Sequence, residues 1–205
     1  MSINPLIHNT NITKALLEQK IKNGSVVVDA TMGNGNDTLF LCQQVLPKGK
    51  VYAFDVQEVA VKNTLKLLKE HQFDSDLGSN IHCIKDSHEN FDQYIFQPVD
   101  LFMYNLGYLP GSDQSIITSP ESTIKSLEMA LSLLKVGGMI SIIIYYAHPG
   151  GNLEKQALEY FLEVLSKKRF KIFKGSMPYN DHCPPIIYMI EKLRQKNTKQ
   201  FKGGF

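Results

Sequence analysis

A loop rich in glycine and asparagine carries the strongest chemical signal in the chain. It runs from Asp29 to Thr38 with the sequence DATMGNGNDT, between an apolar run and a helical pattern. Glycines let a ligand approach the backbone, and the unpaired N–H groups of a helix N-terminus attract polar groups. Asp55 ends the next apolar run, about 20 residues further along, where a carboxylate can accept hydrogen bonds from both ribose hydroxyls. This layout predicts a site for a nucleoside cofactor.

Two cofactor classes use this layout, the nicotinamide dinucleotides and S-adenosylmethionine (SAM). A dinucleotide fingerprint that starts at Gly33 needs Gly or Ala at the position where this chain has Thr38. The Asn and Asp side chains of the loop suit the zwitterionic methionine end of SAM better than a doubly negative pyrophosphate, which a carboxylate repels. A tight turn without a ligand is the competing interpretation, and it is disfavoured because the loop and Asp55 occur together. We therefore expect SAM in this loop, bound by Asn34, Gly35, Asn36 and Asp37.

Two further segments fit the cofactor. Gln57 lies just after Asp55, where side chains usually flank the adenosine. Asp86, Ser87 and His88 follow the third apolar run, where methyltransferases commonly bind the adenine edge. Ser87 is equally suited to cap the next helix, and the two roles are compatible.

The end of the fourth apolar run predicts the place of methyl transfer. Asn105, Leu106, Gly107 and Tyr108 resemble the [DN]-P-P-[YF] motif of amino-group methyltransferases, with Leu-Gly in place of Pro-Pro. The Asn105 amide oxygen and the Leu106 carbonyl can accept amine N–H groups, so that the amine lone pair faces the sulfonium methyl. Tyr108 can pack on the substrate ring. A strand end with a glycine turn and a core tyrosine is the competing interpretation.

A second polar segment ends the fifth apolar run. Tyr146 and His148 lie in the sequence YYAHPGG, at the carboxyl edge where open α/β sheets bind ligands. His148 can accept a proton or contact RNA there, and a plain turn before the next helix is the alternative. The polar loop of residues 179–185 is a further candidate for the substrate entrance. No metal site is expected at His182 and Cys183, because the sequence offers too few partners.

These residues need a sheet to hold them, and β-rich runs alternate with helical patterns along the chain. Continuous valine and isoleucine runs are typical of parallel strands covered on both faces. We expect strands over residues 25–30, 50–55, 81–84, 99–105, 139–146, 170–174 and 186–190. We expect helices over residues 11–22, 37–45, 58–71, 87–95, 121–134 and 153–167, with Gly137-Gly138 closing the helix over residues 121–134. The predicted fold is α/β, a Rossmann-like class I methyltransferase whose seven-stranded, mostly parallel sheet has helices on both faces.

Composition and charge bound the choice of partner. The chain has 205 residues and a net charge of +2, which is low for a protein that coats long nucleic acid. A local contact to a small folded RNA stays open. The candidate phosphate contacts are Lys167, Lys168, Arg169, Lys171, Lys174 and the lysines of the tail.

Location and domain organisation follow from simpler signals. Three widely spaced cysteines without a C-x-x-C motif argue against disulfides and zinc and fit a reducing cytosol. Because neither a signal peptide nor a membrane-spanning run is visible, we expect a cytoplasmic protein. Residues 1–192 should form one methyltransferase domain, with residues 1–24 as an N-terminal helical extension and residues 193–205 as a basic flexible tail.

Four segments together resemble one family. They are DATMGNGNDT, NLGYLPGSD (Asn105 to Asp113), YAHPGG (Tyr146 to Gly151) and the NDHCPP run near the C-terminus. They are similar to the MnmM/YtqB group, bacterial methyltransferases earlier described as rRNA methylases. The resemblance extends from about Ile12 to Lys192, and the combination is specific whereas each motif alone is not. Thr31 departs from the methyltransferase D-x-G-x-G-x-G loop, because it stands in place of the first glycine.

The resemblance implies methylation of the aminomethyl group on the wobble uridine of tRNA, within the anticodon stem-loop. It assigns Asn34, Asn36, Asp37, Asp55, Gln57, Ser87 and His88 to the cofactor, and Asn105, Tyr108, Tyr146 and His148 to the substrate. One alternative is a methyltransferase acting on rRNA or on a small-molecule amine. Others are an NAD-dependent oxidoreductase, disfavoured by Thr38, and a non-catalytic RNA-binding module, disfavoured because Asp55 and the loop glycines are present. The oligomeric state stays open, a homodimer included.

Overall fold

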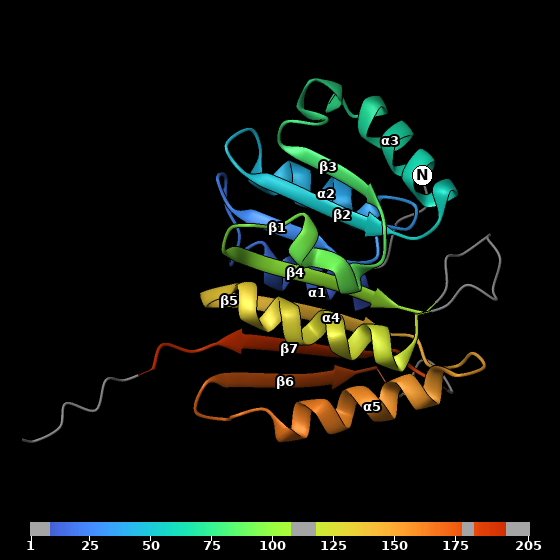
Figure 1. Ribbon diagram of the computed structural model, residues 1–205, viewed down its shortest axis with the longest axis vertical. Coiled ribbons are helices and arrows are strands. Elements are labelled where there is room, and N and C mark those ends of the chain that lie inside the picture. The colour runs from blue at the N-terminus through green and yellow to red at the C-terminus, as the bar shows by residue number, and fades with distance from the viewer. Residues whose placement is uncertain (1–8, 108–117, 178–182, 196–205) are drawn as a thin grey trace, which may run out of the picture.

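The apolar runs of the sequence form a single seven-stranded sheet. The computed structural model describes residues 9–107, 118–177 and 183–195, and the strand order is β3-β2-β1-β4-β5-β7-β6 (Figure 1). The strands are β1 (Val26–Asp29), β2 (Lys50–Asp55), β3 (Ile81–Lys85), β4 (Val99–Leu106), β5 (Leu134–Ile144), β6 (Phe170–Ser176) and β7 (Ile186–Lys192). Strands β1 to β5 pair in parallel, and β7 pairs antiparallel with both β5 and β6. The predicted mostly parallel sheet is confirmed.

Helices cover both faces of the sheet, as predicted. One face carries α1 (Asn9–Leu17), α2 (Asn36–Val45) and α3 (Glu58–Glu70), whereas the other carries the 3₁₀ helix η2 (His88–Gln93), α4 (Pro120–Leu133) and α5 (Gly151–Val164). A second 3₁₀ helix, η1 (Asp74–Asp76), precedes β3. Successive strand residues point to opposite faces. Accordingly, Val27 and Leu101 pack with α1 and α2, whereas Val28 and Phe102 pack with η2 and α4.

The strand order creates the position of the site. From β1 the chain moves outward to β2 and β3 and then returns to the other side of β1 as β4. In open α/β sheets, ligands bind outside the carboxyl ends of the strands at such a reversal. Three predicted site segments lie at that edge, because Asp29 ends β1, Asp55 ends β2 and Asn105 is the penultimate residue of β4.

Among the element boundaries that differ from the sequence prediction, three concern the first helix, the segment 87–95 and the end of α4. The first helix spans Asn9–Leu17 rather than residues 11–22, and the short helix expected over residues 87–95 is a 3₁₀ helix over His88–Gln93. The glycine pair Gly137-Gly138 does not close α4, because β5 begins at Leu134, directly after the helix. The pair lies where the pairing of β4 and β5 shifts register, and a Cβ on Gly138 would approach the Asp100 carbonyl to 3.0 Å. Glycine is thus needed for close strand approach.

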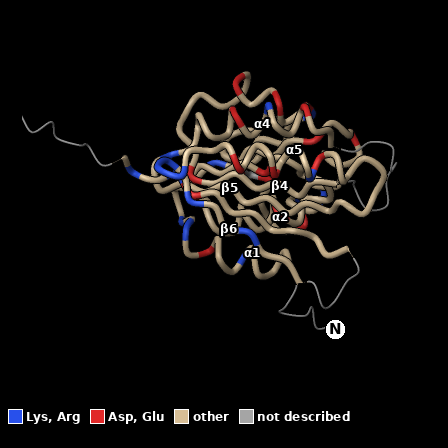
Figure 2. Tube along the Cα trace, turned by 90° about the horizontal axis from the view of Figure 1, so that it is seen from below, with Lys and Arg blue, Asp and Glu red and all other residues tan. Residues whose placement is uncertain are grey.

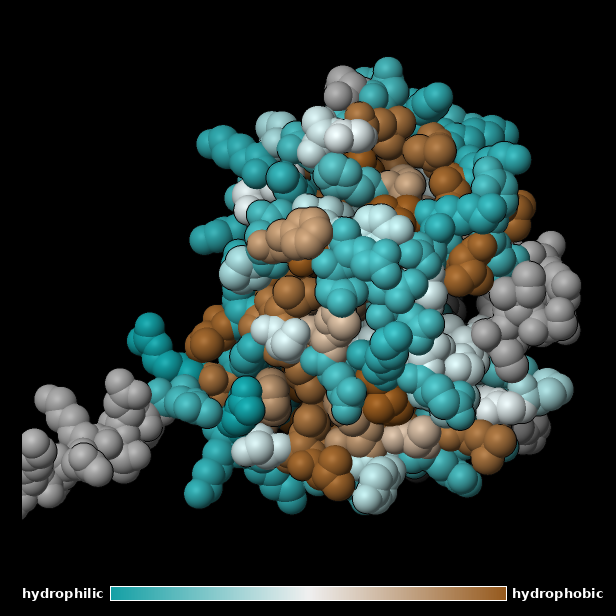
Figure 3. Space-filling model, viewed as in Figure 1, coloured by the Kyte–Doolittle hydropathy of each residue, from teal (hydrophilic) through white to brown (hydrophobic). Residues whose placement is uncertain are grey.

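The surface separates a basic end from the site. Lysines and arginines gather where the C-terminal trace leaves the molecule (Figure 2), at the amino edge of the parallel strands. The exposed Lys167, Lys168 and Arg169, proposed from the sequence as RNA contacts, precede β6 at that edge, opposite the predicted site. Figure 3 shows apolar surface in several patches, and the exposed apolar side chains of α5 include Leu153 and Val164. No helix in the described part of the chain is long and apolar enough to cross a membrane.

Candidate functional site

The loop between β1 and α2 is held in place by α3. Gly35 has a φ of +85°, and a Cβ at this position would lie 2.8 Å from the Thr64 Oγ1 atom. Thr64 also donates a hydrogen bond to the Gly33 carbonyl at 3.2 Å, and the Asn63 amide donates to the Asn34 side-chain oxygen at 3.0 Å. Only glycine allows this approach of α3 in a left-handed conformation. In the part of the chain that the structure describes, no side chain caps the N-terminus of α2, which faces the carboxyl edge.

A buried carboxylate braces the loop from below. Asp29 is 1% exposed; its two oxygens accept hydrogen bonds from the Thr38 hydroxyl at 2.6 Å and from the Thr31 N–H at 3.2 Å. Burial, followed by the charge of Asp37, raises the pKa of Asp29 to about 7. Thr38 therefore has a structural task here, since its hydroxyl satisfies Asp29. A Gly or Ala of the dinucleotide fingerprint would leave that oxygen without this donor.

Asp55 joins the two predicted cofactor segments. Its carboxylate accepts hydrogen bonds from the backbone N–H groups of Gly33 at 3.0 Å and Gln57 at 2.9 Å. Burial raises the pKa of Asp55, and these backbone hydrogen bonds oppose the rise. A carboxylate has about four acceptor positions, so two backbone donors leave room for two ribose hydroxyls. The geometry at Asp55 is consistent with the predicted nucleoside contact.

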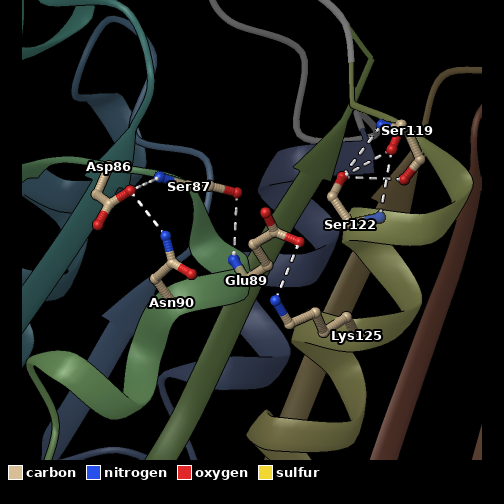
Figure 4. Close-up of polar contacts among 7 residues, drawn as sticks. All are labelled: Asp86, Ser87, Glu89, Asn90, Ser119, Ser122 and Lys125. Carbon is tan, nitrogen blue, oxygen red and sulfur yellow. Dashed lines mark hydrogen bonds and ion pairs between the residues drawn. The ribbon is translucent and has the colours of Figure 1, made fainter.

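The segment after β3 is stabilised by hydrogen bonds to Asp86 and by a helix cap at Ser87. Asp86 accepts hydrogen bonds from the Ser87 N–H at 2.7 Å, the Asn90 amide at 2.9 Å and the Tyr94 hydroxyl at 2.9 Å. Desolvation opposes ionisation, but these three donors outweigh it and lower the pKa of Asp86. Ser87 caps η2, because its hydroxyl accepts the Glu89 N–H at 3.4 Å (Figure 4). The structural role suggested for Ser87 is thus present beside any cofactor role.

His88 is a buried histidine of this segment with one unsatisfied ring nitrogen among the described residues. The residue is 7% exposed, and burial lowers its pKa to about 4, so the imidazole is neutral at physiological pH. Its ring meets the Tyr104 ring edge to face at 5.9 Å. Among the described residues, Nδ1 has no hydrogen-bond partner. A buried, unsatisfied nitrogen is costly, which makes it a candidate contact for a bound group.

Asn105 is fixed by two residues of the β1–α2 loop. Its backbone N–H donates to the Thr31 hydroxyl at 2.7 Å, and its side-chain Nδ2 donates to Asp37 Oδ2. Because an ionised carboxylate only accepts, the amide must turn Nδ2 toward Asp37 and Oδ1 away from it. Oδ1 is buried and has no partner among the described residues. Thr31, which stands in place of the first glycine of the methyltransferase loop, thus helps to align β4 with β1.

Asp37 connects three elements. While Oδ2 accepts the Asn105 amide, Oδ1 lies 2.7 Å from the ammonium of Lys14, on α1. The same ammonium donates to the Asn36 carbonyl at 3.3 Å. The sequence predicted Asp37 as a cofactor residue and did not single out Lys14. Nothing in the local pattern of α1 marks Lys14, since the contact depends on how the helix docks over the loop.

The two tyrosines after β5 point to different faces. Tyr145 packs with the Ile143 cluster on the α1 side, and burial together with the charge of Asp37 raises its pKa. Tyr146, the residue predicted from the sequence, packs on the α5 side beneath the Lys155 ammonium, 4.4 Å from the ring centre. Tyr145 therefore lies within electrostatic reach of Asp37, and the substrate role of Tyr146 stays a prediction.

His148 lies close to the end of β4. A Cβ added to Gly107 would be 3.9 Å from His148 Nε2 and 3.3 Å from the Tyr145 Cβ, so all three positions meet at the carboxyl edge. His148 Nδ1 is 3.0 Å from the Pro149 carbonyl. Tyr108 and residues 179–182, also predicted to reach the substrate, lie outside the described residues. In the described part, no three His, Cys, Asp or Glu side chains gather as metal ligands.

The arrangement matches a known family. A family model described as "Putative rRNA methylase" matches residues 51–191. The chain belongs to this family. Its fold is that of SAM-dependent methyltransferases, as the solved members below also show, so the prediction from the motifs is confirmed at family level.

Three relatives resemble this chain over most of its length. A "putative rRNA-methylase" from Clostridium thermocellum is 40% identical, with a TM-score of 0.86, covering 94% of this chain and all of the other. A methyltransferase from Streptococcus mutans, solved with S-adenosylhomocysteine (SAH), is 36% identical with a TM-score of 0.80 and covers the same shares. The chloroplastic tRNA (mnm(5)s(2)U34)-methyltransferase of Arabidopsis thaliana is 34% identical over 194 residues, 89% of this chain and 69% of its own.

Proposed function

We propose that this family member transfers a methyl group from SAM to the amine of 5-aminomethyl-(2-thio)uridine at the wobble position of tRNA. The observation that carries the proposal is the Asn105 amide. It lies at the carboxyl end of β4, anchored through Nδ2 to Asp37, and its buried Oδ1 lacks a partner among the described residues. A buried acceptor without a donor fits an N–H group that the substrate brings.

The residues of the β1–β3 half fit the cofactor. Asp55 has acceptor capacity for the ribose, the uncapped α2 N-terminus lies beside the loop, and His88 has a free buried nitrogen near the predicted adenine position. Bound SAM supplies an electrophilic methyl group on sulfur. The SAH complex of the 36% identical Streptococcus relative supports this choice of cofactor.

A neutral amide suits an amine acceptor. A primary amine beside a pyrimidine ring has a pKa of roughly 8–10, between the α-amino and lysine values, so it must lose a proton before it attacks. A carboxylate in direct contact would stabilise the unreactive ammonium, whereas an amide oxygen accepts one N–H without doing so. Asn105 would thus orient the lone pair, and holding the two reactants in line would supply most of the catalysis.

The tRNA substrate is supported by the name of the Arabidopsis relative, a tRNA (mnm(5)s(2)U34)-methyltransferase. The direct test is nucleoside mass analysis of tRNA from cells with and without the gene. We expect the aminomethyl form to accumulate without the gene and the methylaminomethyl form to return when it is restored. An unchanged nucleoside profile would refute the proposed substrate.

An rRNA substrate is the second candidate, and the description of the family favours it. Methyl transfer from SAM to an isolated anticodon stem-loop that carries the aminomethyl group separates the two. Activity on ribosomal RNA with none on the stem-loop would establish this second candidate.

A further inference from the structure

We propose that Lys14 is a positioning residue for the methyl acceptor, acting through Asp37 on the Asn105 amide. The inference rests on the proposed function for the identity of the reaction. It adds a residue from the first helix, which no cofactor or substrate motif includes.

The three side chains form a continuous chain of contacts from α1 to β4. Lys14 Nζ lies 2.7 Å from Asp37 Oδ1, and the other carboxylate oxygen accepts from Asn105 Nδ2. Each Asp37 oxygen thus has one defined donor, and the two donors come from different elements. A carboxylate held at both oxygens cannot rotate, and therefore the amide that it binds has one orientation.

The ion pair is shielded from solvent. The Lys14 side chain is 21% exposed and the Asp37 side chain 11%, and the Lys14 ammonium also lies 5.3 Å from the centre of the Phe40 ring. Ion pairs in such surroundings are coupled more strongly than exposed surface pairs, whose contribution is small. The position of Lys14 is therefore well defined by three neighbours: Asp37, the Asn36 carbonyl and Phe40.

A second carboxyl group and one cation lie near Asp37. The carboxyl group is Asp29 on β1, whose pKa is raised by burial and by the charge of Asp37. The Tyr145 hydroxyl approaches from the end of β5, and in the described part of the chain Lys14 is the cation paired with Asp37. Without Lys14, the Asp37 carboxylate loses one anchor and turns toward water. The Asn105 amide is then free to flip and present Nδ2, a donor, to the N–H groups of the acceptor.

The chain offers a matched control. Lys20, just beyond α1, forms an ion pair with Glu191 on β7 at 2.6 Å. Its geometry resembles that of Lys14 and Asp37, but it lies at the amino edge of the sheet, away from the site. Lys20→Met therefore removes an ion pair from the same region of the chain without touching Asn105.

The first experiment needs no substrate. The side-chain amide of Asn105 is followed by ¹⁵N NMR and is identified by its disappearance in Asn105→Ala. We expect its resonance to shift in Lys14→Met and to keep its position in Lys20→Met and largely in Lys14→Arg. An Asn105 resonance that is insensitive to Lys14, or equally sensitive to Lys20, would overturn the proposal.

The second experiment measures turnover on aminomethyl-uridine tRNA. We expect Lys14→Met to lower kcat about tenfold, within the range of coupling between contacting residues, with SAM affinity changed less than about twofold. Lys14→Arg should recover most of kcat. In an Asp37→Asn background, Lys14→Met should add no further loss, because Lys14 acts only through Asp37.

Two kinetic results contradict this scheme. A loss of SAM affinity that explains the whole effect would make Lys14 a cofactor residue, and losses that add in the double variant would make it independent of Asp37. If the wild-type protein leaves this tRNA unmethylated, the proposed function fails, and the NMR experiment still decides the role of Lys14.

Discussion

The two halves of the carboxyl edge are built differently. In the β1–β3 half, the carboxylates of Asp55 and Asp86 accept hydrogen bonds from residues at most 22 positions away: Asp55 binds the N–H groups of Gln57 and Gly33, and Asp86 binds the N–H of Ser87 and the amide of Asn90. In the β4–β5 half, Asn105 is fixed by Asp37, 68 residues away, and Thr31, 74 residues away.

This difference separates two kinds of failure. Substitutions in the β1–β3 half should weaken cofactor binding and leave the structure of the β4–β5 half unchanged. Substitutions in the β4–β5 half should leave cofactor binding intact and disturb the alignment of the methyl acceptor. Variants that mix the two effects would show that the halves are not independent.

The largest effect is expected at Asn105. Asn105→Ala should lower kcat about 100- to 1,000-fold, as the loss of one preorganised hydrogen-bonding group does in other enzymes, because the contact matters mainly in the transition state. SAM affinity measured by calorimetry should hardly change. If Asn105 only ends the strand, the variant would have a lower melting temperature and normal turnover per folded molecule.

Asp55→Ala tests the other half. Loss of two charge-assisted hydrogen bonds to the ribose, each worth roughly 1.5–3 kcal/mol, should weaken SAM binding by at least about 100-fold. Circular dichroism should show a retained fold, and kcat at saturating SAM should fall much less than KM rises. Unchanged calorimetric affinity would remove Asp55 from the cofactor site.

The pH dependence of Asn105→Asp tests whether residue 105 contacts the amine. The shape is kept, but a carboxylate beside the amine favours the ammonium, so more alkaline solution is needed to free the lone pair. We expect the residual activity to rise about one pH unit higher than in the wild type, in steady-state kinetics from pH 6 to 10. A pH profile parallel to that of the wild type would argue against contact between residue 105 and the amine.

The smallest effect concerns the stability of the cofactor half. Burial lowers the pKa of His88 to about 4 from its ordinary 6.5, so the stability present above pH 6.5 is lost as the pH falls toward 4. At pH 5 the loss is about 2 kcal/mol, from the cost per pKa unit. In thermal melts, wild type should lose a few degrees more than His88→Gln between pH 7.5 and pH 5. Equal losses would contradict the buried neutral imidazole.

The fold followed from the sequence because its signals are local. The run from Lys50 to Asp55 forms β2 with the predicted bounds, and the Gly-Asn loop opens α2 as expected. The glycine pair at 137–138 misled the prediction. A helix stop and a register shift both use glycine, and only the contact of Gly138 with β4 distinguishes them.

The site was predictable only as far as its contacts are local. Asp55 follows from its distance to the glycine loop, and Asn105 from its motif at a strand end; their roles stay predictions. Lys14 carries no such signal, because its partner lies 23 positions along the chain and on another helix. Tyr145 and Tyr146 are adjacent and chemically alike, so the choice between them depends on the direction of each side chain after β5.

The antiparallel β7 has a practical consequence for work with the protein. Because β7 starts at the carboxyl edge, it brings the chain back to the amino edge at Lys192, whereas α1 holds Lys14, in its last turn, beside the site. A dye, affinity handle or surface tether attached after β7 would therefore sit at the pole opposite the site. Immobilised in this way, the molecule would present its carboxyl edge to RNA in solution, which an attachment ahead of α1 would obstruct.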